Sequence, residues 1–430
     1  MRNRRKAWRP ANDCSGQSLD SPHEVICASP SMNAPNILVF AYACEPGKGS
    51  EPGAGWAMAR VAARIGPTWV ITRANNREGI EASIPAIPER DRLTFLYIDL
   101  PRRLMRWKRG KRGVHLYYAL WQFAALRVAR SLLRQQRFGF AWHVTFSNIW
   151  LGSAAPLTNL PFVYGPVGGG VTTPWKLVPS LGVAGAAFEV TRTIVRAASR
   201  YLNPLCGLAM RRAAVILAQN EETLQWIPAT WRGKAVVAPN AIVDAPIPER
   251  VIRKDRPPTA LFAGELIPLK GLTLAIRAIS RAPGWRLLIC GEGNDEYRLR
   301  ATARRLGIEG RVRFLGQHPR KEILRLMAEE ADVLLFPSLH DEGLMVVAEA
   351  LTVGLPVVCL DRGGPRGYGV GVRPGTVRVT SRRLARAIMS ASPEGPSDRF
   401  SLDAATKRFA ALLHSRGLLD AQPDHTVDPR

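Results

Sequence analysis

The stretch SLHDEGLMVVAEALTVGLPVV, residues 338–358, places three carboxylates close together. Asp341 and Glu342 precede an apolar run, and Glu349 lies within that run. If one helix held all three, Glu342 and Glu349 would share a face, because seven residues make about two helical turns. Spacing alone therefore favours Glu342 as the acid that works together with Glu349. The alternative for Glu342 is a solvated acid that offsets the dipole at a helix start.

Other residues have the types and positions that bind an anion. Lys270, in GELIPLKG, stands just before a predicted helix, where its ammonium group can neutralise a diphosphate. Gly53 and Gly55, in GKGSEPGAGW, lie between a predicted strand and a predicted helix. Backbone N–H groups and the helix dipole favour an anion at such a turn. The alternatives are a surface lysine at a helix start and a tight strand-to-helix turn.

His143, in AWHVTF, ends a predicted strand at the carboxyl edge of a sheet, where the sites of α/β proteins form. Thr145 follows two residues later, and either side chain could face a substrate. Equally, His143 could be a structural histidine whose ring nitrogens are hydrogen-bonded inside the core. Gly291 and Glu292, in GEGND, form a glycine turn at another strand end and are interpreted as mainly structural. No Asp-x-Asp occurs in the sequence, so no metal is expected.

These residues need elements that hold them, and predicted strands alternate with predicted helices along the chain. This alternation implies parallel sheets wrapped by helices. The fold class predicted is α/β, with two doubly wound, Rossmann-like domains facing across a cleft. The predicted parts are an N-terminal domain at 34–243, a Pro-rich linker at 244–258, a C-terminal domain at 259–398 and a closing helix at 399–417.

The charge of the chain is strongly positive and unevenly spread. The formal net charge is +25, and the window from Leu100 to Phe188 contains no Asp or Glu. Seven basic residues gather between 102 and 112. Such a cluster attracts a nucleic acid, an acidic membrane surface or a phosphorylated substrate. An equally weighted alternative is a solvated basic surface without a partner, in which a high-GC genome encodes Arg where others encode Lys.

Cysteine usage and hydropathy exclude several classes of protein. The six cysteines are scattered without a CxxC pair, which favours a reducing compartment and no structural zinc. No apolar run approaches the roughly 20 residues that span a bilayer. Residues 1–33 are polar and aperiodic, so we expect a disordered leader with a native start at Met32. A disordered tail is expected at 418–430.

The second half resembles a large family of retaining glycosyltransferases. The matching stretches are LFAGELIPLKGLTLAIRAI, LLICGEGND, RVRFLGQHPRKEILRLMAEEADVLLFPS, EGLMVVAEALTVGLPVV and LDRGGP. ACEPGKGSEPGAGW and YGPVGGG, nearer the N-terminus, are similar to one branch of the same family. The family is the group 1, or family 4, glycosyltransferases, and the resemblance covers residues 36 to about 415. It implies the GT-B fold and a nucleotide-sugar substrate.

The resemblance also changes the assignment of the acids. The family pattern has its first acid in the loop after Pro-Ser, then seven residues, then Glu. Pro337 and Ser338 therefore put that first acid at Asp341 rather than Glu342. By resemblance Asp341 faces the transferred sugar, and Glu349 accepts hydrogen bonds from the ribose hydroxyls.

For the remaining donor-binding residues, the resemblance implies a site built from strand ends and the start of one helix. Lys270 is expected beside the leaving diphosphate, and His143 near the transferred sugar. Glu265 stands where the family usually has an Arg, and a carboxylate there repels the diphosphate. The donor-binding residues expected in addition are Gly53, Gly55, Gly264, Gly291, Gly343, Leu344 and Met345.

The predicted function is transfer of a hexose from a UDP- or GDP-sugar to a glycan or lipid-linked acceptor, in cell-surface polysaccharide or glycolipid assembly. No cofactor and no nucleic acid are expected. The basic segment 102–137 predicts contact with an anionic membrane surface, and the expected location is cytoplasmic, peripheral to the inner face of the plasma membrane.

Three alternatives belong to other classes of protein. An inactive relative of the same fold is compatible with Glu265. A sugar-nucleotide epimerase needs carboxylates in both halves, which the acid-free window disfavours. A nucleic-acid-binding protein needs exposed aromatics interleaved with its basic residues and has no use for the donor motifs.

Overall fold

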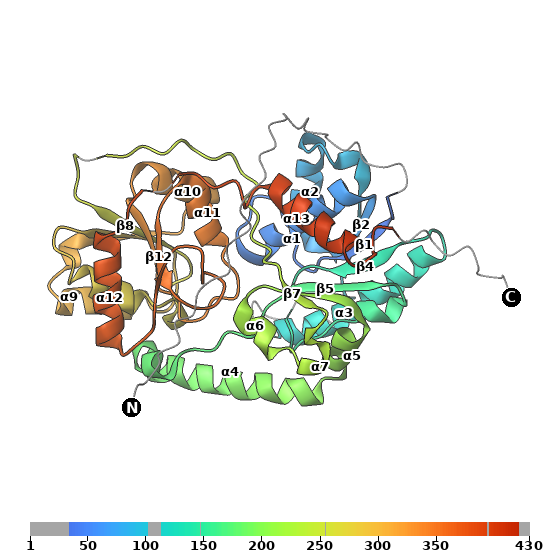
Figure 1. The fold of residues 1–430 in the computed structure, drawn as a ribbon, viewed down its shortest axis with the longest axis horizontal. Coiled ribbons are helices and arrows are strands. Elements are labelled where there is room, and N and C mark those ends of the chain that lie inside the picture. The colour runs from blue at the N-terminus through green and yellow to red at the C-terminus, as the bar shows by residue number, and fades with distance from the viewer. Residues whose placement is uncertain (1–33, 102–112, 147, 254, 394, 421–430) are drawn as a thin grey trace, which may run out of the picture.

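The computed structural model describes residues 34–101, 113–146, 148–253, 255–393 and 395–420. The predicted leader with Met32, the basic cluster at 102–112 and most of the predicted tail lie outside these residues. Two domains lie side by side, each a sheet covered by helices, as Figure 1 shows. The predicted α/β class with two doubly wound domains is therefore confirmed.

In the described part of the chain, the N-terminal domain has a seven-stranded sheet in the order β3-β2-β1-β4-β5-β6-β7. Neighbouring strands run parallel, as expected for strands joined by helical crossovers. The strands are β1 (Ile37–Phe40), β2 (Thr68–Arg73), β3 (Leu93–Ile98), β4 (Phe140–His143), β5 (Phe162–Val167), β6 (Ala213–Ala218) and β7 (Ala235–Val237). Its central strands are short apolar runs with buried side chains, because helices cover both faces.

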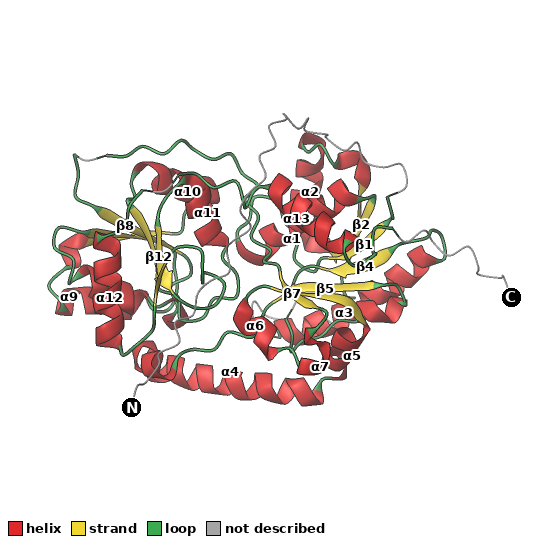
Figure 2. Cartoon of the chain, in the orientation of Figure 1, coloured by secondary structure: helices red, strands yellow, loops and turns green. Residues whose placement is uncertain are grey.

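The helices of this domain pack on both faces of the sheet (Figure 2). They are α1 (Ser50–Ile65), α2 (Arg77–Ser83), α3 (Val114–Leu133), α4 (Gly182–Leu202), α5 (Pro204–Arg212), α6 (Glu221–Trp226) and α7 (Ala229–Arg232). The closing helix α13 (Leu402–His414) also packs here, against α1. Its Phe409 meets Trp142 edge to face, with the ring centroids 5.5 Å apart. Helix α13 therefore lies on the N-terminal domain, although it follows the C-terminal domain in sequence.

The C-terminal domain has, among the described residues, a six-stranded parallel sheet in the order β10-β9-β8-β11-β12-β13. Its strands are β8 (Thr259–Ala263), β9 (Arg286–Cys290), β10 (Val312–Gly316), β11 (Val333–Phe336), β12 (Val357–Leu360) and β13 (Val370–Val372). Its helices are α8 (Leu272–Ile279), α9 (Glu296–Arg305), α10 (Arg320–Glu329), α11 (Met345–Val353) and α12 (Val377–Met389). Strands β9, β8 and β11 are adjacent, so their carboxyl ends bring three loops to one edge.

Helix α4 is an element that the sequence analysis did not predict. It is 21 residues long and runs beneath both domains in Figure 1. It follows the short 3-10 helix η6 (Trp175–Leu181), which packs on α12 of the other domain. Among the described residues, no helix combines the length and the hydropathy that crossing a membrane requires.

Candidate active site

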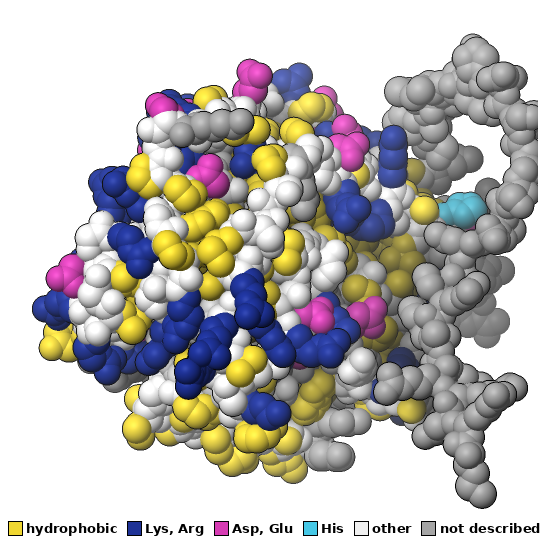
Figure 3. All heavy atoms as spheres, turned by 60° about the vertical axis from the view of Figure 1, so that its left-hand side comes forward, with side chains coloured by type: hydrophobic (Ala, Val, Ile, Leu, Met, Phe, Trp, Pro, Cys, Tyr) yellow, Lys and Arg dark blue, Asp and Glu magenta, His cyan; other side chains and the backbone are white. Residues whose placement is uncertain are grey.

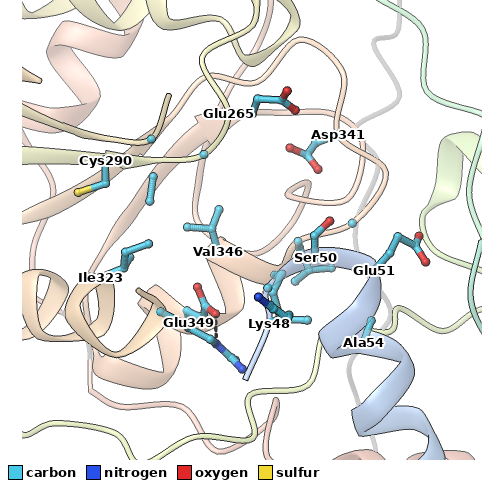
Figure 4. A pocket seen from close by; sticks show the side chains of 18 of the residues that line it. Lys48, Ser50, Glu51, Ala54, Glu265, Cys290, Ile323, Asp341, Val346 and Glu349 are labelled. Atoms are coloured by element: carbon cyan, nitrogen blue, oxygen red, sulfur yellow. Dashed lines mark hydrogen bonds and ion pairs between the residues drawn. The ribbon is translucent and has the colours of Figure 1, made fainter. Parts of the chain in front are cut away.

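A cavity of about 1280 Å³ lies between the two domains. From the N-terminal domain it is lined by the loop at 46–49, by Ser50, Glu51 and Ala54 at the start of α1, and by Gln219 and Asn240. From the C-terminal domain it is lined by the loops after β8, β9, β10 and β11 and by the start of α11. In Figure 4, Glu265 and Asp341 lie towards one end of the cavity and Glu349 lies towards the other. The cavity is large enough for a nucleotide sugar.

Lys270 and Asp341 form an ion pair at this cavity. Lys270 ends the 3-10 helix η7 (Pro268–Lys270) after β8, and Asp341 lies in the loop after β11. The Nζ to Oδ2 distance is 2.5 Å, and both side chains are largely buried. The Lys270 ammonium also lies 5.4 Å from the centre of the Phe336 ring, a distance at which the ring face attracts a cation. The structure therefore brings together two residues that lie 71 positions apart in the chain.

Glu349 forms the second ion pair of the cavity. It lies inside α11 and is only 6 % exposed, and its Oε1 accepts a 2.6 Å hydrogen bond from Arg320 Nε. Burial raises the pKa of Glu349, and the charge of Arg320 acts against that increase. Arg320 Nη2 is buried without a hydrogen-bond partner of its own. A ligand that accepts a hydrogen bond there would satisfy this donor.

Glu342 points away from this pair and contacts the other domain. Its Oε1 accepts from the backbone N–H of Val171 at 3.0 Å, and its Oε2 accepts from Asn220 at 3.1 Å and Thr223 at 3.0 Å. Helix α11 begins only at Met345, so Glu342 is not on the helix of Glu349. The assignment of Glu342 from spacing alone is therefore wrong. Its carboxylate instead joins the Asp341 loop to the N-terminal domain.

We expect Glu342→Ala to loosen the contact between the two domains. Three hydrogen bonds to a charged group are lost, so the free energy of unfolding should fall by about 3 kcal/mol or more. Urea unfolding measures this loss, and small-angle X-ray scattering should give a larger radius of gyration. Glu309→Ala removes an exposed carboxylate elsewhere in the domain and is the matched control. Equal radii for the variant and the control would contradict the role of Glu342.

Gly53 and Gly55, predicted to approach the donor, do not lie among the described residues that line the cavity. A Cβ at Gly53 would stand 2.0 Å from the carbonyl oxygen of Lys48, and one at Gly55 would stand 1.9 Å from that of Ala43. Both glycines are therefore required where α1 packs against the preceding loop. The correction is that the loop residues 46–49 and the start of α1 line the cavity, including Ala54, which lies between the two glycines.

His143 also lies away from the cavity, inside the N-terminal core. It is 2 % exposed, its Nδ1 lies 2.6 Å from Ser153 Oγ, and its Nε2 lies 2.8 Å from the hydroxyl of Tyr118. Thr145 is fully buried, and its hydroxyl accepts from the backbone N–H of Ala43. Neither side chain lines the cavity within the described residues. The core histidine, one of the two sequence-based alternatives, fits this arrangement.

The burial of His143 predicts a dependence of stability on pH. Burial lowers its pKa from 6.5 to about 4. Between these values the unfolded chain binds a proton that the folded protein does not, so stability falls as the pH falls from 6.5 to 4. The loss from this group is about 3 kcal/mol. Urea unfolding at several pH values should show it, and His143→Gln should reduce the slope, leaving the share of His115 and His340, whose pKa values desolvation also lowers. His414→Gln, at an exposed histidine, should leave the slope unchanged.

The other predicted donor residues do line the cavity. The glycines at the ends of β8 and β9, the acid after β8 and the turn into α11 all lie on its wall. They are Gly264, Glu265, Gly291, Gly343, Leu344 and Met345. Gly291 has a φ of +135°, and a Cβ there would stand 2.0 Å from the carbonyl oxygen of Gly264. The first turn of α11 presents backbone N–H groups that have no helical carbonyl to bond.

The sequence analysis missed two kinds of lining residue. Arg320 is the one arginine among the described residues that line the cavity, and no local sequence pattern indicates that the start of α10 lies beside α11. The stretch Pro46–Glu51 overlaps a glycine-rich sequence from which only Gly53 and Gly55 are predicted to approach an anion. The charged lining residues are Lys48, Lys270, Arg320, Glu51, Glu265, Glu292, Asp341, Glu342 and Glu349. Acidic side chains outnumber basic ones in this lining. Each basic side chain is therefore important for binding an anionic substrate against the repulsion of the carboxylates.

The residues of the C-terminal half match a known family. Residues 245–391 match the family described as Glycosyl transferases group 1. These residues belong to the linker and the C-terminal domain. They include Lys270, Asp341, Glu349 and the loops after β8, β9, β10 and β11 that line the cavity.

Two curated relatives are similar to part of this chain. LpsE of Rhizobium meliloti, a lipopolysaccharide core biosynthesis glycosyltransferase, is 27 % identical over 202 residues, which are 44 % of this chain and 56 % of LpsE. A D-inositol 3-phosphate glycosyltransferase of Corynebacterium jeikeium is 32 % identical over 165 residues, which are 34 % of this chain and 39 % of the relative. The chain thus spans about half of the length of LpsE and less of the second relative.

A solved structure shares the arrangement of both domains. HepE of Anabaena, in complex with UDP and glucose, superposes with a TM-score of 0.54 at 19 % identity. The match covers 89 % of this chain and 100 % of HepE. The fold of the chain is therefore GT-B, as the sequence predicted.

Proposed function

We propose that this protein is a retaining glycosyltransferase of the family 4 kind. It transfers a hexose from a nucleotide-diphosphate sugar to a glycan or lipid-linked acceptor in surface-polysaccharide or glycolipid assembly. One observation carries the proposal: Lys270, Asp341 and Glu349 line a single cavity between the domains. A donor that spans the cavity has its diphosphate at Lys270, its sugar at Asp341 and its ribose at Glu349.

The bound UDP and glucose of HepE support a uridine diphosphate sugar as the donor. In this proposal the acceptor hydroxyl attacks the anomeric carbon from the face that the diphosphate leaves. The new bond joins the acceptor oxygen to the anomeric carbon, the bond from that carbon to the phosphate oxygen breaks, and the acceptor proton passes to the departing phosphate. Lys270 and the first-turn N–H groups of α11 offset the charge that develops on the diphosphate. No metal takes part in this scheme.

We expect UDP to stabilise the protein against heat. A ligand that binds only the folded state at about 100 times its Kd adds about 2.7 kcal/mol to the free energy of unfolding. Thermal-shift measurements with UDP, GDP and their glucose conjugates test this. Failure of all of them to stabilise the protein would contradict the proposal and favour an inactive relative of the same fold.

Glu265 provides a sharper form of this test. Its carboxylate lines the diphosphate end of the cavity, where it repels the anion. Glu265→Gln keeps the size of the side chain and removes the charge, so the affinity for UDP should rise about tenfold. Glu292→Gln, on the next strand end, is the matched control. A lower affinity in Glu265→Gln would mean that this carboxylate binds the donor.

The proposed location is the cytoplasmic side of a membrane that carries the acceptor, as a peripheral protein. The basic segment 102–137 is the part proposed from sequence to contact anionic lipids. Within it, helix α3 exposes Arg127 and Arg130, and Arg134 directly after the helix is also exposed. No partner nucleic acid is proposed, because the cavity motifs are those of a nucleotide-sugar site.

A further inference from the structure

Helix α4 turns an apolar side to solvent. From Val183 to Ala197 its exposed residues are Val183, Ala184, Ala187, Phe188, Val190, Thr191, Ile194, Val195 and Ala197. Threonine is the one polar residue among them, and none is charged. Val183 is 90 % exposed, Ile194 63 % and Phe188 59 %. A soluble helix normally presents its polar face to water, so this pattern is inverted.

The polar side of α4 is fixed against the protein. Glu189 and Arg196 are buried, and Arg196 Nη1 donates to the carbonyl oxygens of Gly169 and Val171 at 2.8 Å each. The Arg196 guanidinium also lies 4.4 Å from the centre of the Trp226 ring. The helix therefore has no freedom to rotate and bury its apolar side. The exposed side chains are a feature of the folded protein.

Basic and aromatic side chains border this apolar face. Trp175, at the start of η6, is 77 % exposed, and the Lys176 ammonium lies 5.3 Å from the centre of its ring. Helix α12 packs on η6 and exposes Arg378, Arg382, Arg383 and Arg386. Burial and then the like charges of Arg277, Arg382 and Arg378 lower the pKa of Arg281, so guanidinium groups are concentrated here.

The surface view agrees with this border. In Figure 3 a band of Lys and Arg side chains crosses the face of the C-terminal domain, and hydrophobic side chains gather below it. That lower edge is the level at which α4 runs in Figure 1. An apolar strip beside a basic band is the arrangement of a protein that rests on an anionic membrane.

We propose that the exposed side of α4, together with Trp175 and the arginines of α12, docks on the surface of an anionic lipid bilayer. The apolar side chains enter the boundary between headgroups and acyl chains, Trp175 lies at the headgroup level, and the arginines pair with lipid phosphates. A second copy of this chain is a poorer occupant, because two chains of formal charge +25 repel each other.

This inference deepens the proposed function and rests on it for the acceptor, which a bilayer would deliver as a lipid-linked molecule. Docking through α4 also brings the membrane close to the site. Arg196 holds the loop of Gly169 and Val171, and the N–H of Val171 donates to Glu342 beside Asp341. A membrane-bound acceptor would therefore meet the cavity from the side of this loop.

Vesicle flotation tests the inference without any need for catalysis. The full chain should float with vesicles of phosphatidylglycerol and phosphatidylcholine, and much less with phosphatidylcholine alone. Ile194→Glu and Phe188→Glu should each lower binding to the mixed vesicles about tenfold or more, because a charge replaces an apolar side chain that would enter the bilayer. Ile252 lies in the linker and is exposed to a similar degree. Ile252→Glu makes the same change of charge and should bind the vesicles as the wild type does.

The outcomes separate this inference from the proposed function. If both α4 variants float as well as the wild type, or if none of the proteins floats, the membrane inference is wrong. A dimer in solution that Ile194→Glu dissociates, without flotation of the wild type, would assign the face to a second copy instead. Flotation that depends on α4 in a protein that UDP does not stabilise would keep the membrane inference and remove the glycosyltransferase proposal.

Discussion

Lys270→Ala is expected to lower kcat/KM for the nucleotide sugar about 100- to 1,000-fold. Lys270 is one of three basic lining residues in the described part of the cavity, and it ion-pairs Asp341 at 2.5 Å. Removing one group that stabilises charge developing in a transition state costs about that much. The substitution also leaves the carboxylates of Asp341 and Glu265 without the lysine in the same end of the cavity, which opposes binding of a diphosphate.

The measurement is initial-rate kinetics with the donor that thermal-shift screening selects. Lys321→Ala removes an exposed lysine at the start of α10 and should keep wild-type kinetics. Circular dichroism and UDP-free melting temperatures should show that Lys270→Ala is folded. Donor turnover equal to that of Lys321→Ala would mean that the diphosphate binds elsewhere in the cavity.

The two adjacent acids show what sequence could and could not decide. Periodicity paired Glu342 with Glu349 because it treated residues 341–349 as one helix. The family pattern assigned the first acid to Asp341. In the structure α11 begins at Met345, and Asp341 lies in the preceding loop beside Lys270. The role of Glu342 depends on Val171, Asn220 and Thr223, which lie 119 to 171 residues away. No local pattern contains that information.

The fold was predictable for a different reason. Runs such as ILVF and VLLF are short, apolar and separated by helical patterns, so parallel buried strands are the physical outcome. Helix α4 broke the same rule: its apolar residues face solvent and its polar residues face the protein. A pattern method that assumes apolar residues point inward reads such a segment incorrectly. Sequence patterns therefore do not predict an element such as α4, whose apolar residues do not pack into the core of its own domain.

The glycines and the histidine show a further limit. Gly53, Gly55 and His143 have the residue types of a site and follow strand ends, yet they serve packing. Gly291 has the same signature and does line the cavity. His143 ends β4 and Gly291 directly follows β9, whereas Gly53 and Gly55 lie within α1. Which of them faces the cavity depends on how the two domains meet.

Glu349→Gln is expected to raise the Kd for UDP about 10- to 100-fold with a smaller effect on kcat. The carboxylate has one oxygen on Arg320 and the other available to a ribose hydroxyl, and the amide offers only one acceptor. Each lost charge-assisted hydrogen bond costs about 1.5–3 kcal/mol. Because the ribose does not react, its contacts stabilise ground state and transition state alike, so KM rises more than kcat falls.

Arg320→Ala and the double variant complete the test. If Arg320 acts by holding Glu349, the two substitutions together should cost little more than either alone, because the same contact is lost. If Arg320 Nη2 itself binds the nucleotide, the two costs should add. Isothermal titration with UDP and with uridine separates these cases, since uridine retains the ribose and lacks the diphosphate. Unchanged binding of uridine by Glu349→Gln would show that this carboxylate does not contact the ribose.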